Sequence, residues 1–253
     1  MQNIERDKNR SVADLIRQEI DIYRTWRCHE DKVFSIWFMA LQRWQVEQLA
    51  LRHAQFLKDP RYAPVTRFFL DDMYGLDLRR MADEVERALP LASHIMPDVV
   101  LRTAAVALEL NSRTGLLDQR MTEIIFEEGG ASTITMENYA DAYRRASTRE
   151  ERHLQMALLN ELGNGLDRYV RSRVIYATFR FARRPAHVAG LGGLYDFLDR
   201  GFSAMKPMGS AGEYINVFTG AEHNVVDNLF DQKPDPFQIF VPALSLSESG
   251  AIQ

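Results

Sequence analysis

The sequence predicts an all-α protein, built as a multi-helix bundle of about nine or ten helices. Apolar residues recur at intervals of three or four along most of the chain, which is the period of one face of a helix. The alternation expected of a strand is found only weakly, over residues 238–246. Apolar residues make up 46% of the chain, which is enough for a full hydrophobic core.

The N-terminal part of the chain is expected to form two long helices. Ser11 with Asp14 offers an N-terminal cap for a helix that reaches about residue 29. A second helix is predicted at roughly 31–58. Its apolar stripe consists of Phe34, Trp37, Leu41, Trp44 and Leu51. Two tryptophans on one stripe predict that this helix packs near the centre of the fold.

Prolines and glycines divide the following stretch into shorter helices. Helices are predicted over residues 65–74, 78–89, 98–110 and 116–128. Pro64 fits the first turn of the first of them, Gly75 fits its C-terminal cap, and Pro90 is expected to end the second. The polar run at 111–115, which closes with a glycine, predicts a break between the last two.

Capping sequences place the helices of the second half. Helices are predicted over about residues 136–146, 148–170, 172–183, 186–205 and 211–230. Thr135 is expected to cap the first of them. Ser147-x-x-Glu150 and Ser210-x-x-Glu213 are capping-box patterns for the second and the last.

The helical domain is expected to cover residues 11–230. Residues 1–10 are expected to form a flexible N-terminus, and residues 231–253 a tail whose end has too little apolar content to fold alone. Glycine and small polar residues cluster at 129–133, which is the best candidate for a subdomain break. The sequence leaves open whether this cluster separates two domains or two helices of one bundle.

The stretch from Pro60 to Gly75 contains the pattern F-F-L-x-D-x-Y-G, which begins at Phe68. This pattern resembles the signature of an uncharacterised, mainly proteobacterial family of helical proteins. Four other segments are similar to parts of the same family pattern: T-A-A-V-A-L-E-L, I-T-M-E-N-Y-A-D-A-Y-R-R, F-L-D-R-G-F-S-A-M and D-N-L-F-D-Q-K-P-D-P-F. The run L-D-L-R-R-M-A-D departs from the D-F-x-x-R-D-like run expected after Gly75. The resemblance implies a bacterial protein with a helical fold, and it assigns no role to any residue.

Charge and cysteine content exclude several classes of protein. The net charge of -4 gives no global attraction to nucleic acid or to anionic membranes, so any basic site must be local. The single cysteine, Cys28, cannot form an intramolecular disulfide, which favours the reducing cytosol. The charged first ten residues predict no secretory signal, and no apolar run approaches the length of a membrane helix. We therefore expect a cytoplasmic protein without a membrane segment.

A metal- or haem-dependent site inside the bundle is one interpretation of four residues: Glu47, Glu109, His153 and Glu222. Each of the glutamates lies three or four residues from large apolar positions, and a buried carboxylate needs a cation, a hydrogen-bond donor or a metal. Glu150-x-x-His153 is the only pair with the spacing of a di-metal site in a helical bundle. The competing interpretation is pairing with arginine or exposure at the side of a helix. The G-x-S-x-G, Walker A and H-E-x-x-H motifs are all absent.

The most polarised segment, residues 168–195, contains six arginines and no acidic residue. Aromatic residues are interleaved with the arginines, a composition compatible with binding phosphate groups and stacking on bases. The candidate ligand-binding residues are Arg173, Arg180, Arg183 and Arg184. The alternative is that these arginines pair with acidic residues elsewhere in the fold.

The leading hypothesis is a non-catalytic protein that binds a partner protein or a small anionic ligand through these arginines, with nucleic acid disfavoured. The rival is a metal- or haem-dependent oxidoreductase built on the carboxylate and histidine set. A third hypothesis is a homo-oligomer that buries an exposed apolar face between its subunits. The sequence predicts no particular cofactor and leaves open whether the protein is an enzyme.

Overall fold

The computed structural model describes residues 11–74, 79–96, 98–170, 172–209 and 211–239 of the chain. These residues form helices and no strand, which confirms the predicted all-α bundle. The helices are α1 (Val12–Arg24), α2 (Lys32–Arg52), α3 (Ala54–Lys58), α4 (Ala63–Arg67), α5 (Arg79–Ile95), α6 (Asp98–Thr122), α7 (Met136–Ala146), α8 (Arg149–Val170), α9 (Arg173–Val188), α10 (Gly192–Met205) and α11 (Gly212–Phe230). Four short segments have tighter or wider turns: η1 (Arg27–His29), η2 (Phe68–Met73), η3 (Glu123–Glu128) and η4 (Lys206–Met208). No described helix has both the length and the apolar content required to span a membrane.

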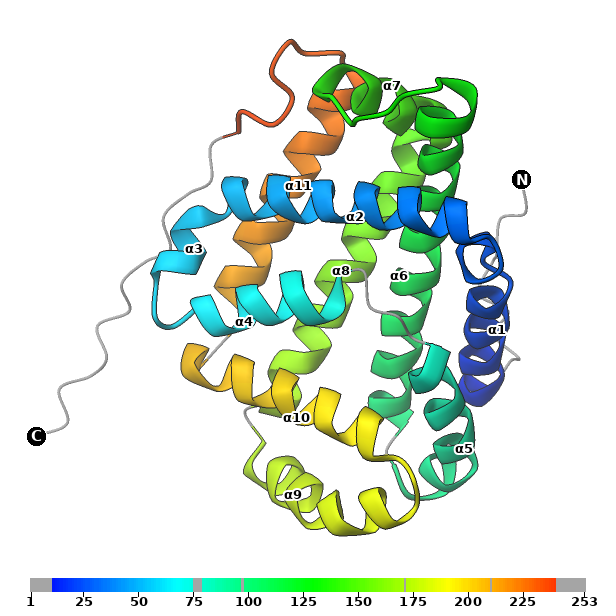
Figure 1. Cartoon of the computed structure of the whole chain (residues 1–253). Coiled ribbons are helices and arrows are strands. Elements are labelled where there is room, and N and C mark those ends of the chain that lie inside the picture. The colour runs from blue at the N-terminus through cyan, green and yellow to red at the C-terminus, as the bar shows by residue number, and fades with distance from the viewer. Residues whose placement is uncertain (1–10, 75–78, 97, 171, 210, 240–253) are drawn as a thin grey trace, which may run out of the picture.

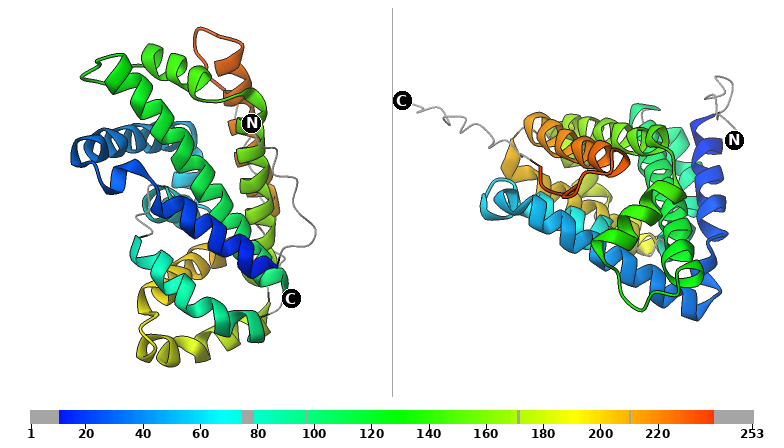
Figure 2. Two further views of the ribbon diagram at one scale, coloured as in Figure 1. Left: turned by 90° about the vertical axis from the view of Figure 1, so that its right-hand side faces the viewer. Right: turned by 90° about the horizontal axis from the view of Figure 1, so that it is seen from above.

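Three long helices run along the length of the molecule, with α8 packed between α6 and α11 (Figure 1). Helix α2 crosses this layer on one face, and α1 packs along α6 (Figures 1 and 2). Helix α7 lies at one end of the molecule, and α9 and α10 lie at the other. Helices α6 and α8 pack against each other although they lie on opposite sides of the predicted break at 129–133.

Capping residues set several of the helix boundaries as predicted. The Ser11 Oγ accepts a hydrogen bond from the Asp14 backbone N–H, and Thr135 forms a capping box with Asn138. The capping box of α8 lies one residue later than predicted, because Thr148 and Glu151 exchange the side-chain bonds. Glu150 is therefore not the capping residue.

Helix α6 continues through residues 111–115, so the predicted break there is wrong. The hydroxyls of Ser112 and Thr114 donate to carbonyls one turn earlier, and their polarity therefore does not interrupt the helix. Gly115 has a packing role instead. A Cβ at Gly115 would lie 2.0 Å from the ring of Trp26, so only glycine allows the indole to lie against the helix.

Pro90 and Pro185 both lie inside helices, and the predicted helix ends at these residues are wrong. Both prolines are exposed, so water can satisfy the carbonyl that each one leaves without a helical donor. Helix α9 ends instead before Gly190, whose φ of 72° lies in the left-handed region that favours glycine.

The predicted helix over 31–58 divides at His53 into α2 and α3. The buried face of α2 consists of Phe34, Phe38, Leu41, Gln45 and Leu49. Trp37 and Trp44 are half-buried, and Leu51, which was placed on the apolar stripe, is 70% exposed. The stripe therefore runs through a glutamine, which introduces a polar group into the core. Some of the predictions fall outside the described residues. These concern residues 1–10, the caps at Gly75 and Ser210, and the tail from residue 240, which includes most of the weak strand pattern at 238–246.

Candidate functional site

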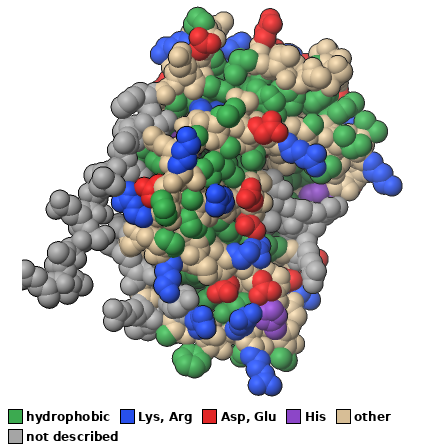
Figure 3. Space-filling model, turned by 60° about the vertical axis from the view of Figure 1, so that its left-hand side comes forward, with side chains coloured by type: hydrophobic (Ala, Val, Ile, Leu, Met, Phe, Trp, Pro, Cys, Tyr) green, Lys and Arg blue, Asp and Glu red, His purple; other side chains and the backbone are tan. Residues whose placement is uncertain are grey.

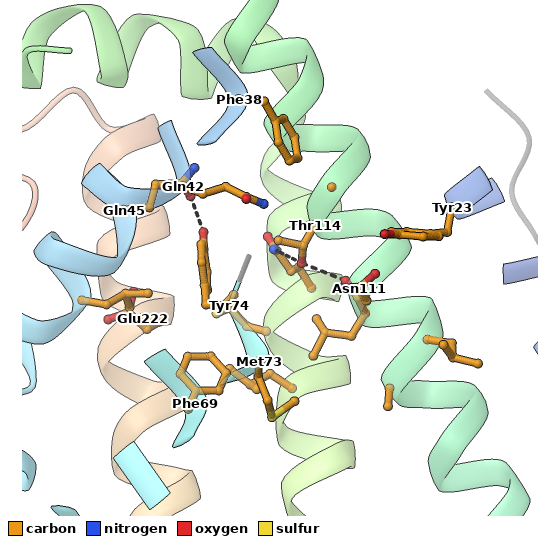
Figure 4. A pocket seen from close by; sticks show the side chains of 18 of the residues that line it. Tyr23, Phe38, Gln42, Gln45, Phe69, Met73, Tyr74, Asn111, Thr114 and Glu222 are labelled. Atoms are coloured by element: carbon orange, nitrogen blue, oxygen red, sulfur yellow. Dashed lines mark hydrogen bonds between the residues drawn. The ribbon is translucent and has the colours of Figure 1, made fainter. Parts of the chain in front are cut away.

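A cavity of about 370 Å³ lies between the layer that contains α2 and the layer of α6, α8 and α11 (Figure 4). This volume falls within the range of known small-molecule sites, about 300–1,000 Å³. The wall is largely apolar and aromatic, with Phe38, Phe69, Met73, Leu110, Tyr139, Tyr143, Met156, Phe218 and Phe237 among its side chains. The polar side chains of the wall include Gln42, Gln45, Gln48, Arg52, Tyr74, Asn111, Thr114, Arg152, Gln155 and Glu222.

An ion pair between Arg52 and Glu222 joins the end of α2 to α11. The guanidinium donates through Nε and Nη2 to the two carboxylate oxygens, at 3.1 and 2.8 Å. The His53 Nε2 lies 2.7 Å from one of the same oxygens, and its ring stacks on Phe218. Burial raises the pKa of Glu222, but the charge of Arg52 and the hydrogen bonds outweigh burial and lower this pKa to about 2. The cluster is therefore an ionised carboxylate matched to a guanidinium.

A second polar group links α2, α6 and the residue that follows η2. The Asp118 carboxylate is fully buried and accepts a hydrogen bond from the Gln45 Nε2 at 3.0 Å. The Tyr74 hydroxyl donates to the other end of the same amide, the Gln45 Oε1, as Figure 4 shows. Burial raises the pKa of Asp118 to about 6, and the bonds from Gln45 and Gln42 and the charge of Arg152 offset only part of this effect.

Arg152 lies on α8 and is only 2% exposed. Its Nε donates to the Ser147 Oγ at 2.9 Å and its Nη1 to the Gln155 Oε1 at 3.3 Å. Its Nη2 lies 3.1 Å from the sulfur of Met121, and the guanidinium stacks over the ring of Tyr143 at 3.9 Å. These partners are all neutral. Among the described residues, no carboxylate oxygen lies within 4.0 Å of this guanidinium.

The four residues of the predicted metal site lie on four different helices. Glu47 is exposed on α2, Glu109 on α6 forms an ion pair with Arg113, and Glu222 on α11 is held by Arg52 as described above. Within the described part of the chain, no group of three or more histidine, cysteine or carboxylate side chains is arranged to hold a metal ion. The structure therefore does not bring these four side chains together.

His153, the fourth of these residues, lies in a polar seam between α8 and α11. Its Nδ1 is 2.7 Å from the Nδ1 of His223, and its Nε2 is 3.0 Å from the Asp227 carboxylate. Arg149 donates to the same carboxylate at 2.8 Å. Burial and the neighbouring His153 lower the pKa of His223, which favours the neutral imidazole.

The predicted arginine site lies at the opposite end of the molecule from α7. Arg180, Arg183 and Arg184 are exposed on α9, whereas the side chain of Arg173 lies outside the described part of the structure. None of the three described arginines lines the cavity.

The cavity residues Gln45 and Arg152, and the buried Asp118 that Gln45 contacts, were missed by the sequence analysis. A signal was present for Gln45, because this residue lies in register with the buried face of α2. Arg152 follows an N-terminal capping sequence at a position where charged residues are common on helix surfaces, so its burial has no local signature.

A comparison with protein-family models matches residues 25–236 to a family described as "Domain of unknown function (DUF8198)". Comparisons with curated proteins and with solved structures find no match.

Proposed function

Since the chain belongs to this family of unknown function, we propose its function from the cavity that its own residues build. The protein binds one small organic molecule with a mainly apolar body and a carboxylate or similar anionic group. The anionic group lies against Arg152. The observation that carries this proposal is a buried guanidinium in the cavity wall with only neutral partners among the described residues.

An anionic ligand would compensate the charge of Arg152. A buried guanidinium is costly unless an anion compensates it, and the nearest contacts of Arg152 are a hydroxyl, an amide, a thioether and an aromatic ring. A guanidinium has five N–H groups, and those of Arg152 make three contacts with acceptor atoms, namely the Ser147 Oγ, the Gln155 Oε1 and the Met121 sulfur. Two N–H groups therefore remain for an anion, and charge-assisted hydrogen bonds to a carboxylate are about twice as strong as neutral ones.

The rest of the wall selects the body of the ligand. Aromatic side chains from η2, α7 and α11 give a broad apolar surface. The amides of Gln42 and Asn111 are placed where they can exchange hydrogen bonds with one or two polar atoms of the ligand. A cavity with an apolar wall and a few polar groups is typical of a small-molecule site. Binding, rather than a chemical step, is the function that this arrangement supports best.

Paired ligands that differ only in the head group test this proposal. Decanoate and 1-decanol are titrated into the purified protein by isothermal titration calorimetry, and decanoate is expected to bind at least about tenfold more tightly. In Arg152→Met this preference for decanoate should disappear, because the guanidinium is the group that recognises the anion. Arg120→Met removes an exposed arginine from α6 and is the matched control, which should keep the preference.

A cavity-filling substitution separates the cavity from other surfaces. Ala107 lines the cavity on α6, and Ala107→Phe should weaken the binding of both ligands. Circular dichroism and thermal unfolding verify that each variant is folded. If neither ligand binds the wild-type protein, or if Arg152→Met keeps the full preference for decanoate, the proposal is wrong.

A further inference from the structure

The C-terminal half of α9 exposes apolar side chains that no described element covers. Phe181 and Val188 are each 83% exposed, and Pro185 between them is also exposed. Single exposed apolar residues are common on protein surfaces, whereas a stripe of them on one helix marks an interaction site. Figure 3 shows hydrophobic and basic side chains protruding together at the lower end of the molecule, where Figure 1 places α9.

The helix is anchored by a different residue, which leaves this stripe free. Phe179 stacks on Tyr195 and packs against Phe202, with ring centroids 4.5 and 4.9 Å apart, and these contacts hold α9 on α10. The tyrosine hydroxyl also donates to the Phe179 carbonyl at 3.2 Å. His187 also reaches α10, where its Nε2 lies 3.1 Å from the Asp196 carboxylate, so the exposed side of this half of the helix is the one that carries Phe181, Pro185 and Val188.

The larger exposed side chains in the C-terminal half of α9 divide into two arcs. At about 100° per residue, Phe181, Pro185 and Val188 fall within an arc of about 60°. The exposed Arg180, Arg183 and Arg184 fall within a separate arc of about 100° on the adjoining side. The free half of the helix is thus amphipathic, with an apolar stripe bordered by arginines.

Two of the arginines beside the stripe, Arg183 and Arg184, form no ion pair within 4.0 Å of any described carboxylate. The nearby Asp196 is instead 3.1 Å from the His187 Nε2. Arg183 and Arg184 are therefore available to carboxylates of a partner, although the chain as a whole carries a net charge of -4.

We propose that this half of α9 docks into an apolar groove with an acidic rim on a partner protein. Phe181, Pro185 and Val188 have the i, i+4, i+7 spacing with which a helix enters such a groove. The arginines match carboxylates at its rim, where charge complementarity gives specificity and a higher association rate. Phenylalanine and arginine also belong to the residue types enriched in protein interfaces. This surface is separate from the cavity, so the proposal does not depend on the ligand.

A membrane surface is a less suitable occupant of this stripe. A helix that lies in a lipid interface carries bulky apolar residues along its length. The free half of α9 offers one phenylalanine and one valine, together with a proline and alanines. This narrow stripe fits a protein groove better than it fits a lipid layer.

Site-specific photo-crosslinking tests the proposal. The full chain, carrying a photo-crosslinking residue in place of Phe181, is irradiated in an extract of its source cells. The control carries the same residue in place of Leu91, which is 62% exposed on α5. An adduct specific to position 181 identifies the partner, which is then purified and titrated against the unlabelled chain by isothermal titration calorimetry.

The titration supports the proposal only if both arcs contribute. Phe181→Ala and the double variant Arg183→Glu, Arg184→Glu should each weaken binding at least about tenfold, and Leu91→Ala should change it less than about twofold. Raising the salt from 0.1 to 0.5 M should slow the association of the wild-type protein. Because all these positions are exposed, the variants are expected to fold, and circular dichroism verifies this.

Four outcomes would overturn the proposal. The first is the absence of an adduct specific to position 181. The second is an adduct between two copies of this chain, with a matching dimer in sedimentation. The third is a captured partner whose affinity is unchanged by the α9 variants. The fourth is binding to vesicles of phosphatidylcholine and phosphatidylglycerol that Phe181→Ala weakens.

Discussion

Arg52 and Arg152 are two buried arginines in the wall of one cavity, and they differ in what lies opposite their charge. Arg52 is bound through two nitrogens to the carboxylate of Glu222. Arg152 has a hydroxyl, an amide and a thioether as partners, and its charge acts on the buried Asp118 carboxylate without an ion-pair contact. Both side chains cross between secondary-structure elements, but only Arg52 forms a close ion pair.

The comparison teaches that burial alone does not distinguish a structural charge from a functional one. In a matched pair such as Arg52 and Glu222 the two charges compensate each other, although the Arg52 Nη1 has no hydrogen-bond partner among the described residues. Removal of either partner would leave the other charge buried and uncompensated. A guanidinium with neutral partners has no such dependent partner, and its charge is available to a ligand. Four substitutions sharpen this contrast, and their expected effects on the free energy of unfolding decrease in the order given.

Arg52→Met is expected to cause the largest loss, about 3–5 kcal/mol in the free energy of unfolding. The substitution leaves the Glu222 carboxylate buried beside His53 without its guanidinium. Urea unfolding at pH 7 measures the loss. The double variant Arg52→Met, Glu222→Gln should recover part of the stability, because no buried charge is then left unpaired. If Arg52→Met lost no more stability than Arg152→Met, the contrast between a structural and a ligand-binding arginine would be wrong.

Asp118→Asn is expected to stabilise the protein at pH 7 by up to about 3 kcal/mol. The pKa of this carboxyl is raised from its ordinary value of 3.8 to about 6, so the folded state binds the proton more tightly than the unfolded state does. Its contribution to stability therefore falls as the pH rises from about 4 to about 6. The amide carries no charge and avoids this loss.

Urea unfolding of wild type and Asp118→Asn at pH 4 and pH 7 tests the sign of this effect. The two proteins should have similar stabilities at pH 4 and should diverge at pH 7. A difference that is independent of pH would show that the carboxyl does not titrate in this range.

Arg152→Met is expected to cost only about 1–2 kcal/mol, although Arg152 is the more deeply buried arginine. It loses hydrogen bonds to Ser147 and Gln155, but no carboxylate is left without a close partner. Differential scanning calorimetry gives the shift in melting temperature relative to Arg52→Met. A loss above about 4 kcal/mol would assign Arg152 a structural role equal to that of Arg52.

Tyr74→Phe should have the smallest effect, about 1 kcal/mol. The hydroxyl donates to the Gln45 Oε1, and its removal leaves that oxygen without this donor while the amide still holds Asp118. Urea unfolding at pH 7 measures the change. A loss of stability as large as that of Arg52→Met would show that the hydrogen bonds among Tyr74, Gln45 and Asp118 stabilise the core as one unit.

Local sequence signals predicted the helical fold and several helix ends. Ser11 and Thr135 cap helices because their side-chain oxygens reach backbone N–H groups within one turn, which needs no tertiary contact. The errors occurred where packing overrode local preference. Gly115 continues α6 because Trp26 occupies the space of a side chain, and Pro90 and Pro185 stay in helices whose exposed faces tolerate a lost hydrogen bond.

The cavity residues could be predicted less well than the fold. Glu222 was selected from its spacing to apolar positions, and the structure pairs it with Arg52, the structural alternative that the sequence analysis had also stated. Asp118 and Gln45 meet across 73 positions of sequence, a separation for which no local pattern exists. Ser147 was assigned to a capping box, whereas its hydroxyl accepts from the guanidinium of Arg152.

The sequence by itself determined that the chain forms amphipathic helices, since helical periodicity and capping act through bonds within one or two turns. It also determined the arginine-rich composition of α9, which needs no fold to be recognised. Only the tertiary structure decided which charges are matched, because Arg52 meets Glu222 across 170 positions of sequence, whereas no carboxylate is brought within 4.0 Å of Arg152 among the described residues. A charge is neutralised by what lies within a few ångströms of it in space, and that neighbourhood exists only after the helices have packed.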